Sequence, residues 1–91
     1  MKLYLISQTE NNDWDTYDSA VVAAPDEDTA RNLNPRAEGE SDSNLFVDWN
    51  NTRESTWFTW ATRPEDVKVK YIGEAVECTP LGVVLTSFNA G

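Results

Sequence analysis

The chain contains no histidine and only one cysteine, Cys78, in 91 residues. Without histidine it lacks the side chain whose ordinary pKa lies near neutrality, which excludes histidine-based acid–base catalysis and histidine metal sites. A lone cysteine cannot form a disulfide within the chain, and without a histidine to activate it we expect Cys78 to be an inert thiol. We therefore expect no enzyme: no catalytic residues, no metal and no cofactor.

Basic residues and long apolar stretches are also scarce. Seven Lys and Arg residues stand against 16 Asp and Glu residues, which gives a net charge of −9. That charge repels phosphate backbones and anionic lipids, so we expect no direct binding to nucleic acid and none to a membrane. No stretch approaches the roughly 18 apolar residues that cross a bilayer. The first residues carry no signal-peptide pattern, which predicts a cytoplasmic protein.

The excess acid is concentrated in residues 10–54, which hold twelve acids and three bases, whereas the remaining residues hold four of each. The oxygen-rich stretch 11–18 does not fit an EF-hand calcium loop, because the glycine position holds Thr16 and the bidentate glutamate position holds Val22. We interpret these acids as a negatively charged surface, suited either to solubility or to a basic partner.

Four stretches have the residue types typical of strands, at 2–7, 17–24, 67–72 and 82–88. The first two are near enough in sequence to form an antiparallel hairpin. A fifth, short strand could form at 57–62, although aromatic rings lie on both of its faces. We expect the large aliphatic residues of these strands, one strand tyrosine and one leucine of the helix to form the core: Leu3, Leu5, Val21, Val22, Leu33, Val67, Val69, Tyr71, Val83 and Leu85.

Residues 25–35 predict one short helix. Pro25 suits the first helical position, acids follow in the first turn, and Pro35 stops the helix. The order of elements predicts an α+β fold, a small mostly antiparallel sheet of four to five strands with one short helix on one face. We expect one domain over residues 1–91, with a variable acidic and aromatic surface segment at about 36–56 and a packed end at 87–91.

The chain has four tryptophans. We expect Trp57, Trp60 or both to fill the core. The other two, Trp14 and Trp49, lie in polar stretches, where exposed rings often anchor protein interfaces. These rings and the acids beside them predict a protein-binding surface: Asp13, Trp14, Asp15, Asp18, Asp48 and Trp49.

An alternative site comes from the alternation of rings and guanidinium groups in the second half of the chain. Such groups can stack on a base and hold its phosphates. This alternative predicts that the following residues converge on a nucleotide pocket: Arg36, Trp49, Arg53, Trp57, Trp60 and Arg63.

Several stretches resemble a group of small phage and prophage proteins. They are residues 15–22, 25–35, 64–69, 72–75 and 87–91, so the resemblance covers most of the chain outside 36–56. It assigns no role to any residue. It implies an accessory protein in the host cytoplasm, a setting in which short acidic proteins are frequently antagonists of host defence.

Three functional hypotheses follow. The first is a non-catalytic counter-defence inhibitor that binds and blocks a host protein, such as a nucleic-acid-binding defence component, through the acidic tryptophan-bearing surface; in one form of it the protein mimics nucleic acid. The second is a sponge that sequesters a nucleotide immune signal in the Trp/Arg pocket. The third is a structural or housekeeping phage protein with a large apolar self-interface and no host target. A homodimer is compatible with the sequence.

Overall fold

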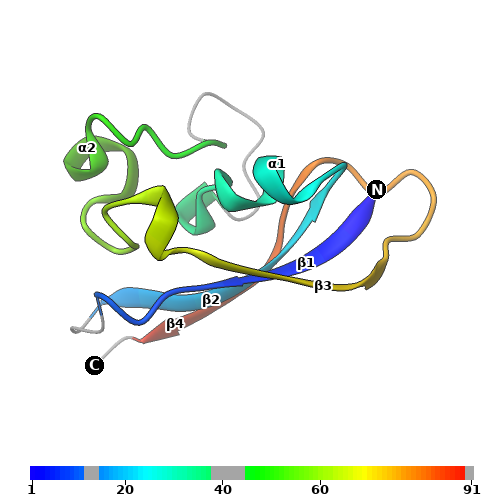
Figure 1. Cartoon of the computed structure of the whole chain (residues 1–91), viewed down its shortest axis with the longest axis horizontal. Helices are drawn as coiled ribbons and strands as arrows, with labels where there is room; N and C mark the ends of the chain where they lie inside the picture. Colours follow the sequence, from blue (N-terminus) through cyan, green and yellow to red (C-terminus); the bar gives the residue numbers. More distant parts are fainter. Residues whose placement is uncertain (12–14, 38–44, 90–91) are drawn as a thin grey trace.

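The computed structural model of the chain describes residues 1–11, 15–37 and 45–89. Four antiparallel strands form one sheet in the order β3–β1–β2–β4 (Figure 1). The α+β class and the hairpin of the first two strands are thereby confirmed. The strands span Lys2–Ser7 (β1), Thr16–Ala24 (β2), Lys68–Glu74 (β3) and Gly82–Asn89 (β4).

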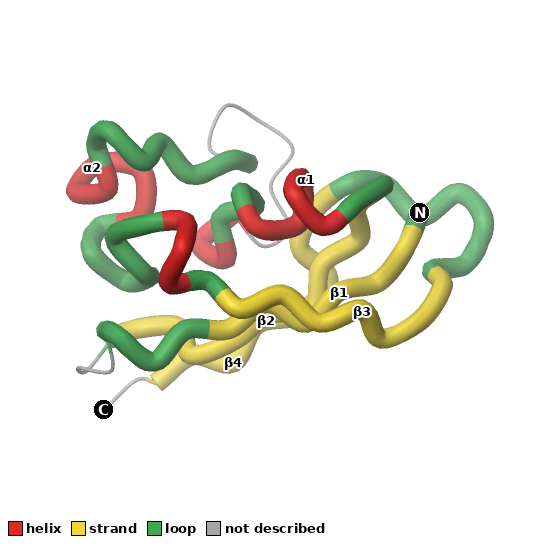
Figure 2. The backbone as a smooth tube through the Cα atoms, viewed as in Figure 1, coloured by secondary structure: helices red, strands yellow, loops and turns green. Residues whose placement is uncertain are grey.

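The helical segments lie on one side of the sheet, and no helix of the described residues covers the other face, which we call the open face (Figures 1 and 2). They are α1 (Glu27–Arg31), α2 (Thr52–Thr56) and two short 3-10 turns, η1 (Pro35–Ala37) and η2 (Pro64–Asp66). The sequence did not predict α2. The helix expected over 25–35 is shorter than predicted, because the Asn32 backbone N–H closes the last turn and Leu33 then forms a β-bridge with Phe46.

Local chemistry explains why α1 begins where it does. The Asp26 side chain caps the helix by accepting a 2.8 Å hydrogen bond from the backbone N–H of Thr29. Hydrogen bonds from Thr29 lower the pKa of Asp26. Glu27 and Asp28 then place negative charge at the positive end of the helix dipole.

The core lies between the sheet and the helical layer. Small side chains on the covered face of β2 leave room for the helices above it, and Trp60 is the largest fully buried side chain among the described residues. The burial of Trp60 confirms the expectation that one of the pair Trp57 and Trp60 fills the core. The buried apolar cluster consists of Tyr4, Ile6, Ala20, Val22, Ala24, Ala30, Leu33, Val47, Trp60, Ala61 and Val67.

The predicted core is only partly correct. Val22, Leu33 and Val67 are buried, whereas Tyr71 and Leu85 are 53% and 61% exposed. Tyr71 lies on the edge strand β3, where its ring meets Tyr4 edge-on and its hydroxyl donates a hydrogen bond to Glu74. The remaining predicted core residues are half-buried: Leu3, Leu5, Val21, Val69 and Val83.

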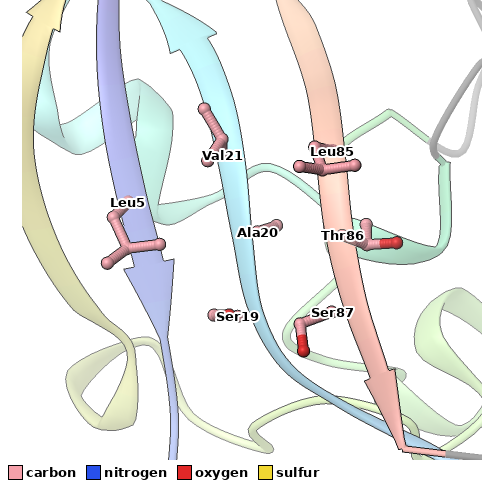
Figure 3. A pocket seen from close by; sticks show the side chains of 7 residues that line it. All are labelled: Leu5, Ser19, Ala20, Val21, Leu85, Thr86 and Ser87. Atoms are coloured by element: carbon pink, nitrogen blue, oxygen red, sulfur yellow. The ribbon is translucent and has the colours of Figure 1, made fainter.

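Leu85 is exposed because it belongs to the open face of the sheet. Leu5 pairs with Val21, and Val21 pairs with Leu85, so the three side chains form a row across neighbouring strands (Figure 3). A hollow of about 80 Å³ lies on this face. Its lining residues are Leu5, Ser19, Ala20, Val21, Leu85, Thr86 and Ser87.

Two further predictions concern the second half of the chain. The short strand at 57–62 does not form, because Trp57 and Phe58 adopt left-handed backbone conformations that end an extended path. The last strand continues to Asn89, but Phe88 is 45% exposed, and its ring centre lies 4.8 Å from that of Tyr17. Residues 90 and 91, the rest of the predicted packed end, lie outside the described residues.

Candidate functional site

The turn that follows α2 carries two exposed aromatic side chains. Asn51 caps α2 by accepting a 3.3 Å hydrogen bond from the Glu54 N–H. The helix ends at Trp57, with φ of 54°, and Phe58 follows with φ of 56°. Bulky residues rarely adopt this left-handed conformation. The exposed fractions are 66% for Trp57 and 53% for Phe58, and we call this pair the aromatic turn.

Hydrogen bonds from distant parts of the chain hold the aromatic turn in place. The Asn11 side-chain amide donates to the carbonyl oxygens of Phe58 and Trp60, at 2.5 and 3.3 Å. The Tyr17 N–H donates to the Thr59 carbonyl at 2.7 Å. Asn11 is itself fixed, because its N–H donates to the side-chain oxygen of buried Gln8 at 2.7 Å. The turn is therefore preorganised rather than loosely attached.

Two arginines accompany the aromatic turn. The guanidinium carbon of Arg36 lies 5.3 Å from the centre of the Trp57 ring, which is cation–π distance. An open hollow of about 470 Å³ lies beside the same ring, lined by Arg53, Glu54 and Trp57. Three of the six residues predicted for a nucleotide pocket thus lie together: Arg36 and Arg53 are both placed at the Trp57 ring.

Arg36 owes its position to a buried asparagine. The Asn34 side chain donates a 2.6 Å hydrogen bond to the Ser55 carbonyl of α2 and accepts one from the Arg36 N–H at 3.1 Å. Asn34 is fully buried. It therefore ties η1 to α2 and sets Arg36 against the end of that helix.

The other three predicted pocket residues lie elsewhere. Trp60 is buried in the core. Trp49 is half-buried against the core, and its indole N–H donates to the side-chain oxygen of Asn32 at 2.8 Å. Arg63 forms an ion pair with Asp66 at 2.9 Å.

The structure describes only some of the residues predicted to form the acidic protein-binding surface. Asp15 and Asp18 at the start of β2 are exposed, as is Asp48 before α2. Asp13 and Trp14 lie outside the described residues. Trp49, the remaining member, packs against the core instead of projecting into solvent.

A second polar cluster joins the segment after β1 to η2. The Thr62 hydroxyl donates to the Glu10 carboxylate at 3.1 Å, and Arg63 bonds Asp66. A hydrogen bond with Asp66 raises the pKa of Glu10, and the same bond, followed by that from Arg63, lowers the pKa of Asp66. The cluster is exposed, so we assign it to surface structure.

Sequence reasoning missed Phe58 as a candidate site residue. A usable signal was present in Asn51 and Glu54, which are spaced as a helix cap and its third helical residue. A helix capped by Asn51 reaches Trp57, and the sequence has no glycine at that point to end it. The aromatic residues must then take the left-handed positions themselves.

Among the described residues, no group of three or more His, Cys, Asp or Glu side chains could hold a metal ion. No helix in the same ranges is long and apolar enough to span a membrane. Comparisons of the chain with protein-family models, with curated proteins and with solved structures find no match.

Proposed function

We propose that this protein is a non-catalytic binding protein that docks on a partner protein through the aromatic turn. The observation that carries the proposal is that Trp57 and Phe58 are both exposed and both held in left-handed conformations. That conformation costs about 1–2 kcal/mol per residue. Strain of this kind clusters at functional sites, and tryptophan and arginine often dominate the energy of protein interfaces.

The charge of the chain defines the kind of partner. With a net charge of −9 the protein attracts basic surfaces and repels acidic ones. A protein that binds nucleic acid has such a basic surface. The resemblance to phage proteins adds the setting: a host defence component in the bacterial cytoplasm, blocked because the acidic protein occupies the place of nucleic acid.

The test is capture of a partner from a bacterial lysate on immobilised protein, with identification by mass spectrometry. We expect the wild type to retain a basic protein that Trp57→Ala loses. Val76→Ala is the matched control, because Val76 is 81% exposed and lies outside the site. Unchanged capture by a folded Trp57→Ala variant, or no specific capture by the wild type, would contradict the proposal.

A second candidate function is sequestration of a nucleotide. It is favoured by the Arg36–Trp57 contact and by the hollow of about 470 Å³, a volume typical of small-molecule pockets. Calorimetric titration with a panel of cyclic and linear nucleotides tests it. We expect binding without turnover that Arg53→Gln weakens and Arg63→Gln preserves. A blank panel removes the nucleotide hypothesis and leaves the protein-binding one intact.

A further inference from the structure

Strand pairing aligns two rows of side chains on the open face of the sheet. Leu5 pairs with Val21 and Val21 pairs with Leu85, and we call these three residues the apolar row (Figure 3). The serine row lies beside it and consists of Ser7, Ser19 and Ser87, which pair in the same way. Paired residues project from the same face of a sheet. Both rows therefore cross β1, β2 and β4 on the side opposite the helical segments (Figures 1 and 2).

Two lysines extend these rows onto β3. Lys70 pairs with Leu5 and Lys68 pairs with Ser7, and both lysines are exposed. Within the described residues, neither lysine forms an ion pair. The two extended rows contain no acidic residue, although the chain has 16 acids and only seven bases. The open face therefore carries local positive charge on a molecule whose net charge is −9.

The relief and the charge of this face determine what it suits. Its hollow measures about 80 Å³, whereas pockets for small molecules measure about 300–1,000 Å³. The face is therefore shallow and suits the surface of a macromolecule. The lysines favour an acidic partner. A nucleic acid or a second copy of this chain carries dense negative charge, which the net charge of −9 repels. A protein segment needs only two carboxylates to match the two lysines.

We propose that the open face binds an acidic amphipathic helix of a partner protein. The apolar row spans three neighbouring strands, about 10 Å, which is the width of a helix. Lys68 and Lys70 lie two residues apart on one strand, about 7 Å, and carboxylates at positions i and i+4 of a helix lie about 6 Å apart. A helix running along the strands thus places its apolar stripe on the apolar row and its acids opposite the lysines. A second sheet would need apolar residues in both rows, and one row consists of serines.

This binding surface is separate from the one in the proposed function. The aromatic turn follows α2 in the helical layer, on the other side of the sheet (Figures 1 and 2). The two surfaces also differ in the charge that they match: the acidic body of the chain attracts basic proteins, whereas the lysines of the open face attract carboxylates. Either surface can therefore be inactivated without the other.

A display library of helical peptides tests the proposal. Each peptide has about 18 residues, enough to form a helix, with leucines along one side and Glu, Gln or Lys varied at the flanking positions. The immobilised protein is the Trp57→Ala variant, which lacks the ring of the aromatic turn, so a failure here leaves the proposed function standing. We expect glutamate flanks to be enriched about tenfold over lysine flanks. Equal enrichment, enrichment of lysine flanks, or no retained peptide overturns the proposal.

Charge reversal then locates the bound peptide. In fluorescence anisotropy titrations of an enriched peptide, we expect Lys70→Glu to weaken binding about tenfold. Lys2→Glu is the matched control, because it changes the net charge equally and Lys2 pairs with the core residue Ala24 on the covered face. Leu85→Ser should also weaken binding. Full binding by Lys70→Glu, an equal loss in Lys2→Glu, or tighter binding of a single-stranded oligonucleotide than of the peptide overturns the proposal.

Discussion

At the scale of single residues, Trp57 combines three properties that rarely occur together. It ends a helix in the left-handed conformation that glycine usually takes, it is exposed, and it contacts a guanidinium group. Selection for stability alone would place a small or flexible residue here. We therefore expect stability and binding to respond in opposite directions to the same substitution.

The comparison of Trp57→Gly with Trp57→Ala isolates the backbone strain. Both variants remove the ring, but only glycine adopts the left-handed conformation without strain. After subtracting the greater freedom of glycine in the unfolded chain, we expect Trp57→Gly to be about 0.5–1 kcal/mol more stable than Trp57→Ala. Denaturant titration measures the difference. A Trp57→Gly variant that is less stable than Trp57→Ala would show that the strain is absent, because only the greater freedom of unfolded glycine would then remain. Both variants should lose partner binding.

Asn34 holds η1 and α2 together beneath the candidate site, and its substitution should lower the free energy of unfolding. Asn34→Ala leaves the Ser55 carbonyl without its 2.6 Å donor in a buried position. An orphaned buried group costs about 1–3 kcal/mol, so we expect that loss in the free energy of unfolding. Asn50→Ala is the control, because Asn50 is exposed and bonds Asp48 through its backbone N–H alone in the described contacts. A loss as large in Asn50→Ala would contradict this role.

At the scale of elements, the cap of α1 makes stability depend on pH. The pKa of Asp26 in the folded chain is below its ordinary value of 3.8, because Thr29 donates to its carboxylate. A lowered folded pKa means that the stabilisation is present above 3.8 and is lost as pH falls through the folded value.

Asp26→Asn keeps a capping side chain that does not titrate. We expect the wild type to have the higher thermal midpoint near neutral pH, and the advantage to shrink as the pH falls below about 4. Asp66, whose pKa is also lowered, is present in both proteins and cancels in the comparison. Parallel pH profiles for the two proteins would show that the Asp26 cap contributes nothing.

The strands could be predicted to within about two residues because residue type and alternation are local properties. It was harder to predict which face of the sheet the helices cover. Both faces of β1 and β2 carry apolar residues: Tyr4 and Val22 on one, Leu5 and Val21 on the other. Alternation shows that two faces exist but not which one the helices cover. The small residues Ala20 and Ala24 mark the covered face, whereas size and hydropathy alone favour the large aliphatic residues as core candidates.

The candidate site depended on contacts that no local pattern contains. Trp57 and Trp60 are similar in sequence context, but one is exposed and the other buried. Their difference follows from the left-handed turn between them and from Asn11, whose amide reaches Phe58 across 47 residues of sequence. A pattern of aromatic and arginine residues could indicate binding, but it could not show which aromatic side chains are buried in the core and which remain exposed.

At the scale of the whole molecule, charge repulsion should weaken the folded state. The molecule is 35 Å along its longest axis and carries a net charge of −9. The Debye length falls from about 30 Å at about 0.01 M salt to about 10 Å at about 0.1 M. We expect the thermal midpoint to rise over this interval. Glu65→Gln combined with Glu77→Gln, both exposed positions, should reduce the rise. A midpoint that falls with salt would contradict net repulsion.

The strand order has a consequence for synthesis of the chain on the ribosome. β1 and β2 are the two inner strands and emerge first, but the outer strands begin only at Lys68 and Gly82. At about 5–20 residues per second, roughly 2–9 s separate the end of β2 at Ala24 from the start of β3. During that interval the nascent hairpin has two unpaired edges and no β3 or β4 beside it. The sheet is therefore complete only after the outer strands β3 and β4 have been synthesised, several seconds after the inner strands.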